Sequence, residues 1–166
     1  MTTEPNVRRA RPRDAQELAA VIRPEDEREI RLATGRSPRE ELSNQILRPG
    51  STVYCVDQGG SILAVFGVSP ATDRVGAPWL LASDSLFKHH LRRFVRDSEG
   101  WIERISRGFD LLENYAYVGN EQHIRWLRRV GFTLLEIVPY GVARQPFWRF
   151  RMVVRKPRTT AAPQES

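Results

Sequence analysis

The side chains of this sequence that could do chemistry lie in a few short segments. They are the thiol of Cys55, the adjacent imidazoles of His89 and His90, the alternating Glu113, Tyr115 and Tyr117, and the polar segments 83–85 and 120–125. A carboxylate beside tyrosines could act as a general base, imidazoles could bind a metal, and a polar helix start could bind an anion. No local pattern suggests a Ser-His-Asp triad.

A metal site is not predicted. Side chains of neighbouring residues diverge by about 100° on a helix, so His89 and His90 cannot bind one ion together. His123 lies far along the chain, and Cys55 is the only cysteine, which excludes an internal disulfide. Cys55 lies in an apolar, β-rich run, and this position favours a buried, unreactive thiol.

Glu113, Tyr115 and Tyr117 are expected on one face of a strand, where two interpretations stay open. The face could carry a general base, or the three side chains could simply pack against neighbouring strands. The sequence therefore identifies no catalytic residue.

The segment from Asn120 to Val130 has the pattern of an amphipathic helix. Its apolar side carries His123, Ile124, Trp126, Leu127 and Val130, and its polar side carries Glu121, Gln122, Arg125, Arg128 and Arg129. Asn120 is expected to cap the first turn with its side chain, and Gly131 is expected to end the helix. Trp126, Leu127 and Val130 should then pack on a sheet together with Phe94 or Val95.

The apolar periodicity around these segments predicts a mixed order of helices and strands. Helices are expected over about residues 14–22, 25–33, 38–47 and 120–130, and in a long stretch from Leu86 that bends near Gly100. Strands are expected over about residues 7–11, 51–56, 62–68, 77–82, 111–118, 132–138 and 147–155. Asp14 is expected to cap the first helix, and Ser83, Asp84 or Ser85 the long one. The fold class is α/β, with a mixed sheet of six to seven strands and flanking helices.

Composition restricts the class of protein further. The 166 residues are 40% hydrophobic and 28% charged, which is enough apolar surface for a core. No apolar run approaches the ~18 residues that a membrane span needs, and the start lacks the pattern of a secretion signal. We expect an intracellular protein with one domain over residues 7–156 and disordered ends at 1–6 and 157–166.

The positive charge is concentrated in the second half of the chain. The formal net charge is +6, and residues 86–158 contain 15 basic and 7 acidic side chains. A positive surface is expected on the outer face of the 120–130 helix and on the arginine side of the last strand. No nucleic-acid-binding motif accompanies these arginines, so a solvated face and an acidic protein partner both stay open.

The order of elements and the segment from Asn120 to Phe132 resemble the GNAT superfamily of acetyltransferases. In that superfamily an Asn after the penultimate strand opens a short helix that Gly-Phe closes, as Asn120, Gly131 and Phe132 do here. The resemblance implies acetyl-CoA as the cofactor and an amine of a small molecule or protein as the acceptor. It assigns cofactor contacts to Leu81, Ala82, Ser83, Asn120 and Trp126.

A narrower resemblance covers about residues 77–152. The segments Trp79–Asp84, Glu113–Tyr115, Val118–Asn120 and His123–Leu127 resemble the small GNAT-like internal virion protein A of short-tailed phages. This resemblance implies other phage virion proteins as partners, and action in the host cytoplasm during assembly or in the virion. Self-association stays open.

Two departures from the acetyltransferase pattern favour a degenerate acetyl-CoA site. Residues 82–87 occupy the place of a glycine-rich pyrophosphate loop, yet they contain no glycine and carry the carboxylate of Asp84. Leu127 stands where a tyrosine commonly protonates the leaving thiolate. The sequence thus predicts a phage virion or assembly protein with a GNAT-like fold, and the alternative is an active N-acetyltransferase.

Overall fold

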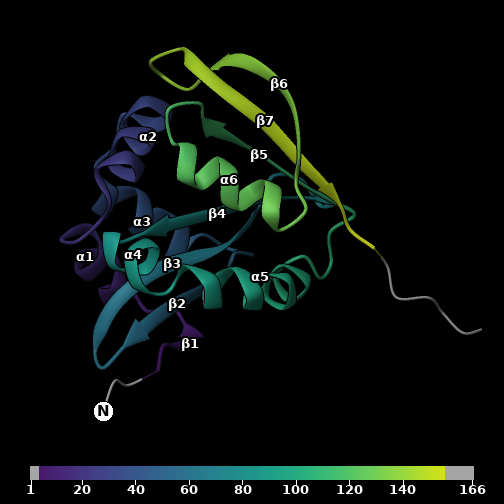
Figure 1. The fold of residues 1–166 in the computed structure, drawn as a ribbon. Coiled ribbons are helices and arrows are strands. Elements are labelled where there is room, and N and C mark those ends of the chain that lie inside the picture. The colour runs from purple at the N-terminus through teal and green to yellow at the C-terminus, as the bar shows by residue number, and fades with distance from the viewer. Residues whose placement is uncertain (1–3, 156–166) are drawn as a thin grey trace, which may run out of the picture.

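The computed structural model describes residues 4–155, which form seven strands and six helices (Figure 1). The strands are β1 (Asn6–Arg9), β2 (Thr52–Gln58), β3 (Ser61–Pro70), β4 (Val75–Ala82), β5 (Leu111–Tyr117), β6 (Thr133–Tyr140) and β7 (Gln145–Val153). The helices are α1 (Pro12–Ala19), α2 (Pro24–Thr34), α3 (Pro38–Leu47), α4 (Asp84–His89), α5 (Leu91–Ile105) and α6 (Glu121–Arg129). Of the ends expected to be disordered, 1–6 and 157–166, residues 1–3 and 157–166 lie outside the described residues, whereas Asn6 is the first residue of β1.

All seven strands belong to one sheet in the order β1-β2-β3-β4-β5-β7-β6. Neighbouring strands are antiparallel except β4 and β5, which are parallel. This parallel pair is in register only at Val75–Leu111 and Gly76–Leu112, so the two strands separate towards their carboxyl ends. The predicted mixed α/β sheet with flanking helices is confirmed.

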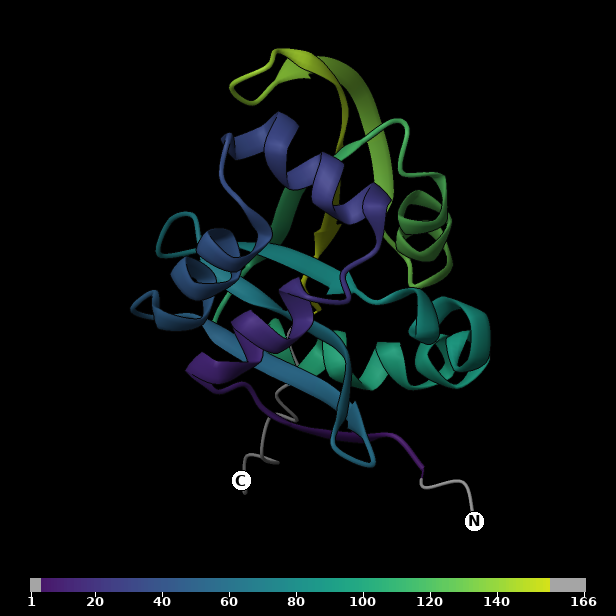
Figure 2. The ribbon, with the colours of Figure 1, turned by 90° about the vertical axis from the view of Figure 1, so that its left-hand side faces the viewer.

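Helices cover both faces of the sheet (Figure 2). The first three helices lie on one face, and α4, α5 and α6 lie on the other. Because both faces are covered, β3 has eight consecutive buried residues, from Ile62 to Ser69. Within residues 4–155, no helix is long and apolar enough to cross a membrane.

The predicted packing of α6 is confirmed. Trp126, Leu127 and Val130 belong to the core between the sheet and α5, and Leu127 is only 1% exposed. The rings of Trp126 and Phe94 are stacked with their centroids 5.9 Å apart. The apolar spacing of this helix therefore gave the correct rotation about its axis.

Two predictions about helix boundaries are wrong. The long helical stretch is interrupted at His90, whose φ of −129° lies outside the helical range, and not at Gly100, which lies within α5. Asp14 is not the N-cap of α1, because Arg11 occupies that position. Asp14 is the third helical residue, and its carboxylate accepts a hydrogen bond of 2.6 Å from the Arg11 backbone N–H.

Candidate functional site

The carboxyl ends of β4 and β5 are the place where this sheet could bind a ligand. In α/β sheets, ligands bind where parallel strands end and the chain leaves in different directions. Here β4 ends at Ala82 and leads into α4, whereas β5 ends at Tyr117 and leads through Asn120 into α6. The predicted contacts Leu81, Ala82, Ser83, Asn120 and Trp126 all lie on or beside these two connections.

The backbone of Ala82 bonds to Asp26 in the first turn of α2 and to Arg23, the N-cap residue of that helix. Its N–H donates to Asp26 Oδ2 at 2.9 Å, and its carbonyl oxygen accepts from the Arg23 N–H at 2.9 Å. Ser83 is buried next to it, and both its N–H and its hydroxyl donate to the Leu63 carbonyl. Of the three residues expected to cap the following helix, Ser83 occupies the N-cap position of α4, but its side chain makes no capping hydrogen bond.

The Asn120 side chain also bonds to α2, across more than 90 residues of sequence. Its Oδ1 accepts from Arg23 Nη2 at 2.9 Å, and its Nδ2 donates to Asp26 Oδ1 at 2.9 Å and to Glu29 Oε2 at 2.8 Å. Asn120 is 1% exposed and makes no capping hydrogen bond to α6. The predicted capping role is therefore wrong, because the α2 side chains take every hydrogen bond of the amide.

Arg23 and Asp26 bring opposite charges into the protein interior. Arg23 is 1% and Asp26 is 2% exposed, and Arg23 Nη1 lies 3.8 Å from Asp26 Oδ1. The guanidinium also lies over the Phe87 ring, 4.1 Å from its centroid. Burial raises the pKa of Asp26, and the charges of Arg23 and His123 oppose that rise.

His123 completes this group of buried polar side chains. Its ring is 6% exposed, and its Nδ1 lies 3.5 Å from Glu29 Oε1. Burial alone would lower the pKa of His123, but the nearby Glu29 and Asp26 carboxylates raise it above its ordinary value. We call Arg23, Asp26, Glu29, Asn120 and His123 the polar cluster.

The five predicted cofactor contacts have different surroundings. Ala82 and Asn120 are brought together, because Asp26 accepts a hydrogen bond from each. Trp126 lies beside the polar cluster, with its ring against His123 and its Nε1 donating to Ser98 Oγ at 3.2 Å. Leu81 is not part of this group, since it packs with the core under α1 and α3.

Two cavities approach the gap between β4 and β5 from opposite faces of the sheet. The cavity beside α2 and α3 has a volume of about 240 Å³, and its wall includes Glu29, Tyr115 and Tyr140. The cavity beside α5 and α6 has a volume of about 20 Å³, room for about one water molecule. Both cavities share Pro78, Trp79 and His123 in their walls, so these side chains separate them.

The other side chains singled out in the sequence have structural partners. The Glu113 carboxylate lies 3.3 Å from Arg149 Nη1, and the Tyr115 ring stacks on the Tyr140 ring with centroids 4.0 Å apart. Tyr117 contacts the Phe147 ring. The side chains of Glu113, Tyr115 and Tyr117 therefore pack against neighbouring strands, which is one of the two interpretations of this strand face.

The thiol and the imidazoles have no arrangement for metal binding or nucleophilic attack. Cys55 is fully buried, and burial raises the pKa of its thiol to about 12. The rings of His89 and His90 lie 6.3 Å apart at an interplanar angle of 72°. Among residues 4–155, no group of three or more His, Cys, Asp or Glu side chains could hold a metal ion.

Sequence reasoning missed Arg23, Asp26, Glu29 and His123 as functional candidates. One signal was present: His123 lies on the apolar side of its helix, where a polar side chain needs a buried partner. The α2 residues gave no such signal, because the sequence of that helix is mostly charged and looks solvent-exposed. Which of its charges is buried depends on how α2 docks against β4 and α6.

A protein-family model matches part of this chain. The family model described as "Bacteriophage T7, probable scaffold protein Gp13" matches residues 52–136, about half of the chain. The chain belongs to this family. The matched segment includes Ser83, Asn120 and His123 of the candidate site, whereas Arg23, Asp26 and Glu29 precede it. No curated protein matches the chain.

Solved structures with a similar fold are GNAT acetyltransferases. The protein yncA from Salmonella typhimurium, solved with its cofactor acetyl-CoA, has a TM-score of 0.68 at 13% identity, over 97% of this chain and 100% of that chain. The ribosomal-protein-S18-alanine N-acetyltransferase from Escherichia coli has a TM-score of 0.66 at 14% identity, over 96% and 99%. The spermidine N-acetyltransferase from Vibrio cholerae, in complex with CoA and spermine, has a TM-score of 0.64 at 14% identity, over 90% and 95%. These likenesses show that the fold is the GNAT fold.

Proposed function

We propose that this chain is a virion-associated or assembly protein of a short-tailed phage, related to internal virion protein A, and that it does not transfer acetyl groups. The family match supports a role in phage assembly. The claim that this chain does not transfer acetyl groups rests on the polar cluster, which occupies the gap where β4 and β5 separate. Its partners would be other phage virion proteins, met in the host cytoplasm during assembly.

The first argument concerns the groups that would have to bind the cofactor. The resemblance assigns cofactor contacts to Ala82 and Asn120. In this structure Asp26 and Arg23 take both backbone groups of Ala82, and α2 takes every hydrogen bond of the Asn120 amide. A cofactor would have to displace buried, charge-assisted hydrogen bonds, each worth roughly 1.5–3 kcal/mol.

The second argument concerns the pyrophosphate. Phosphates bind at helix starts where glycines let backbone amides approach closely and where the charge is favourable. The helix that follows β4 has only six residues, and the first of them is Asp84. A carboxylate at this position repels a diphosphate, and residues 82–87 contain no glycine.

The third argument concerns proton transfer. The resemblance places Leu127 where a tyrosine would protonate the leaving thiolate. Leu127 is buried in the core and has no proton to give. Acetyl-CoA is thus a poor fit to this site.

The experiment that tests the assembly role is mass spectrometry of purified particles of the phage that encodes this chain. The proposal predicts the chain as a stoichiometric component of mature particles, or of assembly intermediates that precede them. Its absence from both kinds of particle would overturn the assembly role.

An active N-acetyltransferase is the second candidate. It is favoured by the GNAT fold and by the 240 Å³ cavity, whose carboxylates and tyrosines could receive an amine. This candidate requires a competent cofactor site. With a Kd of about 10 μM, 1 mM acetyl-CoA would stabilise the fold by about 2.7 kcal/mol. For a chain of this size, that corresponds to a rise in melting temperature of about 5–10 °C. Our proposal predicts no rise.

A further inference from the structure

A groove between α5 and α6 lies on the face of the sheet opposite α1 and α3. It has a volume of about 360 Å³ and is lined by Phe87, Leu91, Val95, Gln122, Arg125, Trp126, Arg128 and Arg129. The polar cluster is not part of its wall. We call this surface the α5–α6 groove.

The floor of the α5–α6 groove is apolar. Phe87, Leu91 and Val95 are spaced four residues apart along the α4–α5 stretch, and each stays partly exposed. Trp126 closes the floor from the α6 side, and it is 9% exposed. Apolar side chains of a partner would bury this strip and remove its apolar surface from water.

The rim of the α5–α6 groove is basic. Its only charged wall residues are Arg125, Arg128 and Arg129, and all three are exposed. Arg125 faces Glu121 at 3.9 Å, with both side chains more than three-quarters exposed. The side chains of Arg128 and Arg129 make no ion pair or hydrogen bond with any residue of the described range 4–155.

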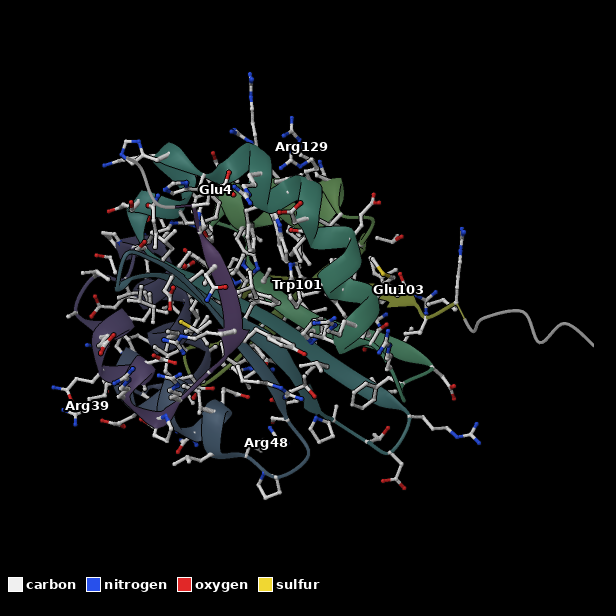
Figure 3. All side chains as sticks on the ribbon, turned by 90° about the horizontal axis from the view of Figure 1, so that it is seen from below. Glu4, Arg39, Arg48, Trp101, Glu103 and Arg129 are labelled. Atoms are coloured by element: carbon white, nitrogen blue, oxygen red, sulfur yellow. The ribbon has the colours of Figure 1, made fainter. Side chains whose placement is uncertain are left out.

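A second hollow continues the basic surface past α4. It shares Phe87 and Leu91 with the α5–α6 groove, and it adds the exposed Lys88 and Arg92. Arg129 is visible at this end of the molecule in Figure 3, with Arg39 on the opposite side. The basic side chains thus flank the apolar strip from both the α6 and the α4 side.

We propose that the α5–α6 groove binds an acidic segment of another protein that carries apolar side chains along one face. The acidic groups would pair with the arginines of α6 and with Lys88 and Arg92, and the apolar groups would cover Phe87, Leu91 and Val95. The inference rests on the proposed assembly function, because it names the kind of partner that such a protein would bind. A nucleic acid fits less well, since its phosphates would pair with the rim but leave Leu91 and Val95 of the floor uncovered.

The predicted positive surface is only partly present, which narrows the docking area. Arg149 of β7, part of the predicted basic strand face, pairs instead with Glu113 at 3.3 Å and with Glu136 at 2.8 Å. Its charge is therefore balanced within the protein. The arginines of the α5–α6 groove, in contrast, keep unpaired positive charge at its rim.

Fluorescence anisotropy of the full chain with labelled probes tests this inference. The first probe is a 16-residue peptide of glutamates with leucines every three or four residues. The second is the same peptide with each leucine replaced by serine, and the third is single-stranded dT16. We expect the leucine peptide to bind at least about tenfold more tightly than the serine peptide, because only the former covers the apolar floor. Its affinity should fall as salt rises.

Two variants locate the binding surface. The double variant Arg128→Gln with Arg129→Gln should weaken the binding of the leucine peptide by about fivefold to thirtyfold, since exposed charge pairs contribute up to about 1 kcal/mol each. Leu91→Ser should lower the affinity for the leucine peptide and leave the affinity for dT16 unchanged. The control is Arg13→Gln with Arg39→Gln, which removes the same charge from exposed positions on α1 and α3, and it should leave binding unchanged.

With the peptide probes and the variants, three outcomes would overturn the inference. They are no binding of the leucine peptide, equal binding of the leucine and serine peptides, and a loss of affinity in the control as large as in the α6 variant. Tighter binding of dT16 than of the leucine peptide would assign the surface to nucleic acid and would also overturn it. None of these outcomes depends on acetyl-CoA, so a failure of the docking inference is distinct from a failure of the proposed function.

Discussion

Replacement of Asn120 by serine separates a structural role in the polar cluster from a role as a helix cap. Serine and asparagine are about equally good N-caps, so a residue that only caps α6 would tolerate this change. In the structure, however, Asn120 makes three hydrogen bonds of 2.8–2.9 Å to charged side chains of α2. Serine is too short to reproduce them, and Arg23 and Asp26 would stay buried with fewer partners.

The expected size of the effect follows from those three bonds. A hydrogen bond to a charged group contributes about 1.5–3 kcal/mol, and the loss of a buried partner adds a desolvation cost. Some relaxation and water entry will reduce the sum, so we expect Asn120→Ser to lower the free energy of unfolding by about 3–5 kcal/mol. The loss of a helix cap alone would cost about 1 kcal/mol.

Urea denaturation followed by circular dichroism measures this difference. Ser37→Ala is the matched control, because the Ser37 hydroxyl accepts a capping hydrogen bond from the Glu40 N–H at 3.3 Å on an exposed helix start. We expect a loss of about 1 kcal/mol for that control. A loss below about 1 kcal/mol for Asn120→Ser would refute the structural role of the polar cluster.

Three further predictions follow from the packing and from the pKa shifts. Leu127→Ala should lower the free energy of unfolding by about 2–5 kcal/mol, because this side chain is 1% exposed in the core, and a loss below 1 kcal/mol in urea would contradict the packing of α6. The folded-state pKa of His123 lies above its ordinary value near 6.5, so its contribution to stability is complete below that pH and is lost as pH rises through the raised pKa. In wild type the urea midpoint should therefore decrease as pH rises above 6.5, and this decrease should be smaller in His123→Gln. An unchanged pH profile in the variant would count against the pairing of His123 with Glu29. The Cys55 thiol, fully buried and with its pKa raised to about 12, should react with a disulfide reagent only upon unfolding, and rapid reaction of the native chain at pH 8 would show that the β2 region opens.

The sequence alone predicted the parts of the fold that depend on local periodicity. The rotation of α6 could be predicted because His123, Trp126, Leu127 and Val130 recur at helical spacing, and the core of the structure contains these residues. The helix interruption could not be predicted in the same way. Gly100 has the residue type that weakens a helix, but it lies on the exposed surface of α5, where glycine costs only about 1 kcal/mol.

The hydrogen-bond partners in the candidate site could not be predicted from the sequence. Asn120 and Ala82 were both expected to contact a cofactor, and in the structure both donate hydrogen bonds to Asp26. Their partners on α2 could not be predicted, because they lie more than 90 residues from Asn120 and are ordinary charged residues in the sequence. Only the docking of α2 against the separated ends of β4 and β5 makes them buried.

Isothermal titration calorimetry with acetyl-CoA tests the central claim most directly. The claim is that the polar cluster occupies the gap between β4 and β5 and that this protein uses the GNAT fold without its cofactor. We predict no saturable heat of binding with acetyl-CoA up to about 1 mM, a concentration at which binding would correspond to about −4 kcal/mol. Saturable binding with a micromolar Kd would contradict the account and would favour an active N-acetyltransferase.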